Sequence, residues 1–213
     1  MLRRATAIGL ALLLLLPGYN QAQSVDPGPI QVGDRWSYEI KDTLTGDLRR
    51  ATTIVVGDVT NNEITTRVTV RGRDRPPQTI VHDLDWGHID DGVSKLRPPG
   101  IGIKRPLQIG REWRSDANGV HLQSGVTYRA EGVAKVVGRE QVTTPAGTFD
   151  TFRVNMTGQV INTKDQTQSQ TWTFVVWYAP AVNRWVKKTS EWRSEGRVRD
   201  SFSEELTEYS RKP

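Results

Sequence analysis

The 213-residue sequence contains no cysteine. This absence excludes disulfide bonds, zinc–thiolate and iron–sulfur sites, a cysteine nucleophile and a lipidated N-terminal cysteine. Only three histidines are present, which leaves few ways to build a histidine-rich metal site. The sequence also lacks a Gly-x-Ser-x-Gly elbow, a Ser-x-x-Lys motif, a His-Glu-x-x-His motif and a phosphate-binding loop. We therefore predict a protein that is not an enzyme, with no catalytic residue, no metal and no cofactor.

Long apolar runs are also missing, except for one at the N-terminus. Residues 1–4 carry two arginines, residues 5–16 are almost wholly apolar, and Pro17 and Gly18 end the run. This order is typical of a secretory signal peptide, here a helix within residues 1–22 that is cleaved after Ala22. The apolar run of about 12 residues is short for a membrane span, although an uncleaved anchor is the alternative. We expect a soluble periplasmic or secreted protein that is not a lipoprotein, with one domain over residues 23–213.

The sequence has no concentrated charge of one sign. Loss of Arg3 and Arg4 with the signal peptide lowers the 29 basic residues to 27, against 24 acidic ones, so the formal net charge falls from +5 to +3. Basic and acidic residues alternate within 71–75 and 191–195. Nucleic-acid binding requires a concentrated basic face, so we predict no nucleic-acid partner.

Alternation of apolar and polar residues with a period of two recurs along the rest of the chain. It predicts strands over 64–71, 80–86, 120–136 and 152–160, and a strand over 172–178 that is covered on both faces. Val198, Phe202 and Leu206 are spaced by four, which fits a helix or a strand, and the context favours a strand. Turn signals separate these segments, and Asn118-Gly119 is the strongest of them; the others lie at 45–47, 61–62, 91–92, 145–147, 164–165 and 195–196.

Short internal similarities indicate two related halves. Residues 31–36 (QVGDRW) resemble 108–113 (QIGREW) at an offset of 77, and residues 55–58 (VVGD) resemble 136–139 (VVGR) at an offset of 81. The halves would cover about 28–97 and 105–209, joined by the Pro-rich connector 97–106. Two half-buried sheets can cover one another. We predict an all-β fold: an antiparallel meander that forms a sandwich or a partly open barrel.

Three segments carry a family resemblance: 106–113 (PLQIGREW), 137–154 with PAGTF at 145–149, and 177–187 (WYAPAVNRWVK). Their order and spacing resemble a group of exported bacterial β-rich proteins classed as domains of unknown function. Asn183 stands where that group usually has glycine, and asparagine also tolerates a positive φ. The resemblance implies a periplasmic or extracellular β-fold. It carries over no catalytic residue.

The densest polar cluster lies at residues 82–91, which contain two histidines and four aspartates. A metal site would need these groups on one side of a strand, but His82 has the parity of Ile80, whereas Asp83 and Asp85 have the opposite parity. We therefore predict a buried His82 rather than a metal ligand.

Tryptophan is abundant, with seven in the chain. Trp36 and Trp113 occupy equivalent positions in the repeat, which favours a role in the core. An indole offers a flat apolar face and one N–H donor, so tryptophans can also line a ligand site. We expect an apolar or lipid-like ligand, or an envelope partner, and leave the oligomeric state open. The alternatives are a glycan-acting hydrolase or carbohydrate-binding module, and a purely structural assembly module. The candidate ligand-binding residues are Trp86, Trp177, Trp185, Trp192 and His82.

Overall fold

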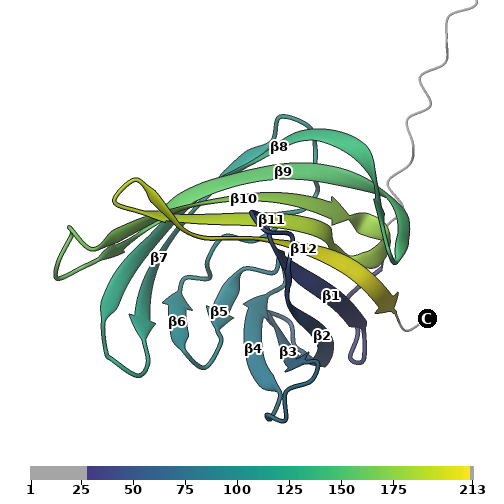
Figure 1. Cartoon of the computed structure of the whole chain (residues 1–213), viewed down its shortest axis with the longest axis horizontal. Helices are drawn as coiled ribbons and strands as arrows, with labels where there is room; N and C mark the ends of the chain where they lie inside the picture. The colour runs from purple at the N-terminus through teal and green to yellow at the C-terminus, as the bar shows by residue number, and fades with distance from the viewer. Residues whose placement is uncertain (1–27, 212–213) are drawn as a thin grey trace, which may run out of the picture.

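Twelve antiparallel strands close on themselves as a barrel in the computed structural model, which describes residues 28–211 (Figure 1). Each strand pairs with its neighbours in the sequence, and the first also pairs with the last. The strands are β1 (Arg35–Asp42), β2 (Leu48–Val59), β3 (Glu63–Val70), β4 (Gln78–Asp83), β5 (His88–Asp90), β6 (Ser94–Arg97), β7 (Glu112–His121), β8 (Thr127–Thr144), β9 (Gly147–Asn162), β10 (Ser169–Ala179), β11 (Arg184–Ser194) and β12 (Arg197–Ser210).

The all-β meander is confirmed, and the C-terminal segment is a strand as expected. Of the two predicted architectures the structure shows the barrel and not the sandwich, and the barrel is closed rather than partly open, because β1 pairs with β12 along its whole length. The predicted signal helix over residues 1–22 lies outside the described residues. No helix in the described part of the chain is long and apolar enough to cross a membrane.

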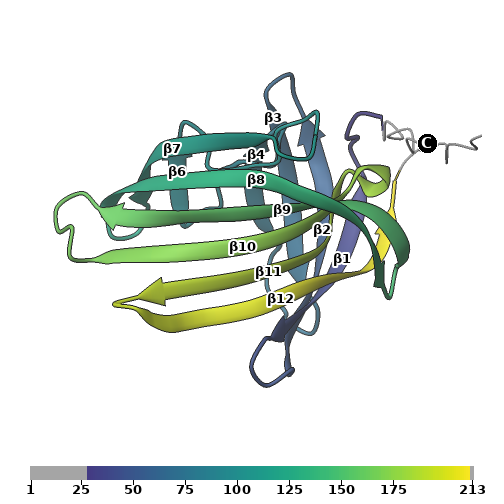
Figure 2. The ribbon, with the colours of Figure 1, turned by 90° about the horizontal axis from the view of Figure 1, so that it is seen from above.

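Most strands of the second half are longer than those of the first, where only β2, with 12 residues, is of comparable length. Strands β7 to β12 have 10 to 18 residues, whereas β4 to β6 have 6, 3 and 4. Figure 2 shows β8–β12 side by side, with β1 and β2 crossing behind them. The hairpins β9–β10 and β11–β12 lie at one end of this long sheet, and the C-terminus lies at the other.

The two QxG segments form the same turn. Gly33 has φ 92° and donates its N–H to the carbonyl of Val56 at 2.8 Å, and Gly110 has φ 88° and donates to the carbonyl of Val136 at 2.8 Å. Glycine is suited to both positions because it adopts a positive φ without strain. Val56 therefore corresponds to Val136, at an offset of 80 rather than the 81 of the sequence similarity. Each of the two strands has a register shift directly after that valine.

The end of the barrel near the C-terminus is closed by residues 28–34 and by the 3-10 helix η1 (Pro180–Val182). The indole N–H of Trp36 donates to the carbonyl of Val182 at 2.9 Å, and that of Trp86 donates to the carbonyl of Asn183 at 3.0 Å. Asn183 has φ 53°, so it fulfils the turn role expected for it. Buried aromatic and aliphatic side chains fill the interior above this end, among them Tyr38, Ile64, Val136, Val154, Tyr178, Val186 and Leu206.

The Pro-rich connector 97–106 contributes side chains to the core of the barrel. Its Ile103 is buried and donates its N–H to the carbonyl of Asp85 at 2.6 Å, and its Gly102 accepts the indole N–H of Trp113 at 3.1 Å. Ile101 packs against the core. The segment between β6 and β7 thus folds into the barrel as an internal plug.

Three local predictions are wrong. The strand predicted over 80–86 ends at Asp83, because Trp86 takes φ 65° in a turn. The segment 120–136 is a hairpin, with Gly125 (φ 68°) in the turn between β7 and β8. Asn118-Gly119 lies inside β7, where Gly119 faces the ring of Tyr128; an added Cβ would lie 2.2 Å from that ring. This glycine provides space rather than a turn.

Candidate ligand-binding site

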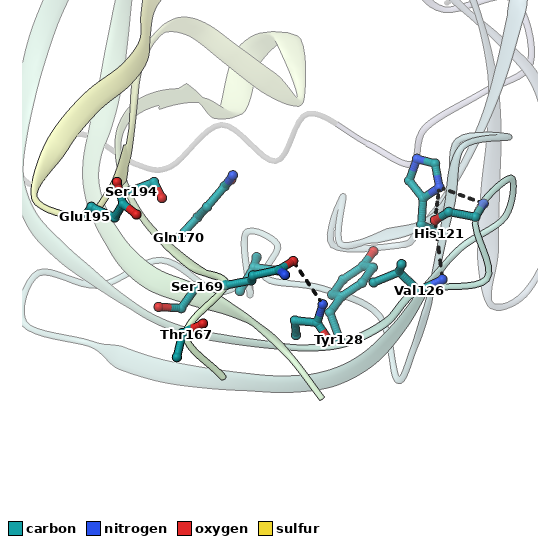
Figure 3. Close-up of a pocket in the computed structure, with 12 residues that line it drawn as sticks. His121, Val126, Tyr128, Thr167, Ser169, Gln170, Ser194 and Glu195 are labelled. Atoms are coloured by element: carbon teal, nitrogen blue, oxygen red, sulfur yellow. Dashed lines mark hydrogen bonds between the residues drawn. The ribbon is translucent and has the colours of Figure 1, made fainter. Parts of the chain in front are cut away.

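A hollow of about 620 Å³ lies between the hairpins at the open end of the barrel. We call it the mouth. Most of its lining residues are polar, and Figure 3 shows His121, Val126 and Tyr128 on one side with Gln170 and Ser194 on the other. The complete lining is His121, Ser124, Val126, Tyr128, Val160, Asn162, Thr167, Gln168, Ser169, Gln170, Ser194 and Glu195.

A second hollow of about 340 Å³ adjoins the mouth and shares Tyr128 and Val160 with it. We call it the aromatic chamber, because Trp172, Phe174 and Trp192 form one wall. Trp172 and Phe174 stack with ring centres 4.6 Å apart, and Phe174 meets Trp192 edge to face at 5.8 Å. The other lining residues are His88, Asp91, Ser94, Leu96, Gly100, Ile101, Ser115, Ala130 and Glu131.

Two glycines allow Trp172 to lie flat on the sheet. Gly132 and Gly158 pair across β8 and β9, and Gly158 also pairs with Trp172 across β9 and β10. An added Cβ would lie 2.9 Å from the indole at Gly132 and 2.2 Å from it at Gly158. Because real Cβ contacts are essentially never shorter than 3.0 Å, the shape of the aromatic chamber depends on glycine at these positions.

A third hollow of about 110 Å³ lies deeper and shares Ile101 and Phe174 with the aromatic chamber. We call it the inner chamber. Lys188 is the one charged residue in its wall. The Lys188 Nζ lies 3.2 Å from Glu204 Oε1, and Glu204 Oε2 accepts the indole N–H of Trp185 at 3.3 Å. The remaining lining is Trp86, Gly102, Ile103, Met156, Val176 and Trp185.

A buried guanidinium lies behind two indoles of the inner chamber. Arg184 is 2% exposed, and its Cζ lies 4.2 Å from the ring centre of Trp86 and 4.1 Å from that of Trp185. Trp36 lies 5.2 Å away. The Nε and Nη1 atoms of Arg184 have no hydrogen-bond partner within residues 28–211. Burial lowers the pKa of Arg184, yet arginine stays protonated in proteins, so this is a buried positive charge stabilised mainly by aromatic faces.

His82 is buried as expected, and its ring contacts Trp86 with centres 5.5 Å apart. Neither ring nitrogen has a hydrogen-bond partner in the described part of the chain. Burial, with smaller contributions from the charges of Arg184 and His88, lowers the pKa of His82 to about 3, so the imidazole is neutral at pH 7. His82 does not line any of the three hollows. Among residues 28–211, no group of three or more His, Asp or Glu side chains is arranged to hold a metal ion.

The structure brings three of the four candidate tryptophans to the hollows. Trp86 and Trp185 line the inner chamber and Trp192 lines the aromatic chamber. Trp177 lies on the outer face instead, where its indole N–H donates to Glu140 Oε1 at 2.7 Å. The strand over 172–178 is accordingly half-exposed on that face, rather than covered on both.

Trp172, Phe174 and Lys188 line the hollows but are not among the predicted ligand-binding residues. The shared parity of Trp172 and Phe174 was a signal that both face the same side of β10. Lys188 has the parity of Val186 and Trp192 on β11, but lysine usually faces solvent, so this parity did not single it out. A register shift lies between Trp177 and Tyr178 in the pairing of β10 with β11. This shift leaves Trp185 opposite the inward-facing Tyr178.

Comparisons with known proteins identify the fold and no family. No family model matches the chain, and no curated protein matches its sequence. A solved structure from Parabacteroides distasonis, described as a putative lipoprotein, is similar with a TM-score of 0.59 and 14% identity, over 86% of this chain and 98% of that one. A putative exported protein with YmcC-like fold from Bacteroides fragilis is similar with a TM-score of 0.59 and 13% identity, over the same shares. The chain thus has the barrel fold of these two proteins.

Proposed function

We propose that this protein is a non-catalytic binding protein of the bacterial cell envelope, and that its ligand is an amphiphile with a single apolar chain. The observation that carries the proposal is the aromatic chamber, where Trp172, Phe174 and Trp192 present apolar faces to a hollow that shares Tyr128 and Val160 with the mouth. Its volume of about 340 Å³ lies within the usual range of small-molecule sites, roughly 300–1,000 Å³.

The envelope location draws on two independent features. Residues 1–22 have the order of a secretory signal peptide. The two similar structures are described as a putative lipoprotein and a putative exported protein. The chain has no cysteine that could carry the usual N-terminal lipid anchor.

A glycan hydrolase is less well supported, because it would need two facing carboxyl groups about 5–10 Å apart and available to the substrate. The acidic groups beside the chambers are already engaged with other side chains. Glu131 accepts from Gln159 Nε2 at 2.9 Å, and Glu204 is held by Lys188 and Trp185. The apolar chamber favours binding.

The test uses N-phenyl-1-naphthylamine, an uncharged dye that fluoresces in apolar sites, with the mature protein purified without detergent. We expect saturable binding by the wild-type chain. Ala130 lines the aromatic chamber, so Ala130→Phe fills it and reduces the affinity at least tenfold. Val137, on the same strand, is exposed, so Val137→Phe is the matched control and leaves binding unchanged. Absence of dye binding, or equal loss in both variants, would overturn the proposal.

A further inference from the structure

The charges around the inner chamber define the head group of the ligand. We propose that the ligand is a long-chain carboxylic acid that binds with its carboxylate innermost, against Lys188. This inference rests on the proposed function, since it assumes that the aromatic chamber holds an apolar chain. It adds the chemical class of the ligand and the direction in which it lies.

The first argument is the balance of buried charge. Two cations, Lys188 and Arg184, lie in or directly behind the wall of the inner chamber, and one carboxylate, Glu204, acts on both of them. The other titratable groups beside Arg184 are neutral at pH 7, because the pKa of His82 is about 3 and burial raises the pKa of both Tyr38 and Tyr178. One positive charge is therefore left without a partner within the described residues. A buried charge is unfavourable unless it is paired, so an anion bound here would be stabilised.

The second argument is the hydrogen-bonding capacity of Lys188. An ammonium group has three donors, and the hydrogen bond recorded for Lys188 Nζ goes to Glu204 Oε1. The Lys188 side chain is 20% exposed, and it faces the hollow. A ligand carboxylate can thus bind the ammonium while the Glu204 pair stays in place. Arg184, whose guanidinium lies behind Trp86 and Trp185, adds a favourable field rather than a direct contact.

The third argument is size. The inner chamber of about 110 Å³ corresponds to roughly four water molecules at ~30 Å³ each. This space holds a carboxylate and the first carbons of a chain, but not a sugar or a zwitterionic phospholipid head group. The aromatic chamber then takes the continuing chain.

The fourth argument is direction. Acidic residues line the outer part of the path: Asp91 and Glu131 in the aromatic chamber and Glu195 in the mouth. Glu131 is paired with Arg129 and Glu195 with Arg199, so a carboxylate at the mouth meets no unpaired cation among these groups. At the inner end it binds Lys188 and lies in the field of Arg184. The gradient of charge along the hollows favours the orientation with the head group inside.

The experiment measures displacement of N-phenyl-1-naphthylamine by dodecanoic acid, 1-dodecanol and dodecylamine at pH 7.5, each below its solubility limit and, for the acid and the amine, below the micelle concentration. These three compounds share one chain and differ in the charge of the head group. For the wild-type protein we expect the acid to displace the dye at a concentration at least tenfold lower than the alcohol or the amine.

The variants assign the preference to the inner chamber. The double variant Lys188→Met with Glu204→Gln removes the buried pair together, so it leaves no unpaired carboxylate and avoids a simple loss of folding. We expect its affinity for the acid to fall at least tenfold, with unchanged affinity for the alcohol. Glu204→Gln alone removes the competing acid and should tighten acid binding. The matched control is Lys187→Met, because Lys187 pairs with Glu205 on the outer face, beside Trp177.

The outcomes separate the two proposals. Equal displacement by acid and alcohol in the wild-type protein, or an equal effect of the Lys188 double variant and Lys187→Met, would overturn the anionic head group while leaving amphiphile binding intact. If no dye binds to the wild-type chain, the proposed function itself fails.

Discussion

The indole of Trp172 covers Gly158 so closely that a Cβ atom on this glycine would lie 2.2 Å from Cζ2 of the ring and 2.1 Å from the backbone oxygen of Glu131. The contact with the backbone of Glu131 cannot be relieved by a rotamer change, so Gly158→Ala forces strands β8 and β9 apart. We expect the free energy of unfolding to fall by at least ~1–3 kcal/mol, the usual penalty for overpacking. Urea denaturation followed by tryptophan fluorescence measures this change.

The control for this prediction is Gly138→Ala on β8. An added Cβ at Gly138 has no atom within 4 Å, and alanine restricts the unfolded chain more than glycine does. The unfolding free energy of Gly138→Ala should equal that of the wild-type protein or exceed it by ~0.5–1 kcal/mol. Equal stability of the two alanine variants would show that the sheet adapts easily and that Gly158 does not shape the aromatic chamber.

The closed end of the barrel depends on an ion pair between distant parts of the chain. Asp34 is fully buried, and its Oδ2 accepts from Arg211 Nε at 3.3 Å and from the backbone N–H of Gln31 at 3.1 Å. Arg211→Met weakens the compensation of a buried carboxylate, so we expect a loss of at least ~2 kcal/mol of unfolding free energy. Arg199→Met breaks an exposed pair with Glu195 and should change stability by less than ~1 kcal/mol. Thermal unfolding of both variants at pH 7 compares them directly.

His82 makes the fold sensitive to acid. The pKa of His82 is about 3 in the folded protein, against an ordinary value of 6.5. Between these pH values, His82 is therefore protonated in the unfolded chain and neutral in the folded one. Stability therefore falls as the pH drops from 6.5 toward 3, by up to ~1.4 kcal/mol per pH unit from this group. His82→Phe removes this contribution and keeps a ring beside Trp86. We expect the unfolding free energy of His82→Phe to fall less than that of the wild-type protein when the pH is lowered from 7 to 4.5.

The control for the acid effect is His121→Gln, at the exposed turn of the mouth. Its unfolding free energy should follow that of the wild-type protein across the same pH range. A parallel pH dependence of His82→Phe and the wild-type chain would show that His82 becomes protonated without unfolding.

The fold class could be predicted because half-buried strands impose a period of two on the sequence. Barrel closure could not, because it depends on the pairing of Arg35 with Ser210 and of the residues that follow, and no local pattern records a partner 175 positions away. The repeated turns at Gly33 and Gly110 were visible for the opposite reason: each is a short segment whose glycine is required by its own φ.

For the candidate site, the sequence predicted the type of residue in its wall but not which individual residues lie there. Abundant tryptophan indicated a ligand site, but the sequence could not separate Trp177 on the outer face from Trp185 at the inner chamber. These two residues are distinguished by the register shift between β10 and β11, and a shift of one residue moves a side chain to the other face of a sheet. The plug formed by Ile101 and Ile103 was hidden for a similar reason, because proline and glycine suggest a surface connector.

Arg184 offers the sharpest test of whether the interior is built for stability or for binding. A buried charge without an ion-pair partner opposes folding, and replacing such a group with an apolar side chain of similar size is often neutral or stabilising. We expect Arg184→Met to leave the unfolding free energy unchanged or to raise it by ~1 kcal/mol, while its affinity for dodecanoic acid falls several-fold. Arg184→Lys is the comparison, since a compact, strongly hydrated ammonium cannot stack between Trp86 and Trp185 as a planar guanidinium does. If Arg184→Met lowers the unfolding free energy by more than ~2 kcal/mol, the contacts of the guanidinium with the three surrounding indoles more than compensate for the burial of its charge. Arg184 would then be a structural residue, and the preference for an anion would have to arise from Lys188 alone.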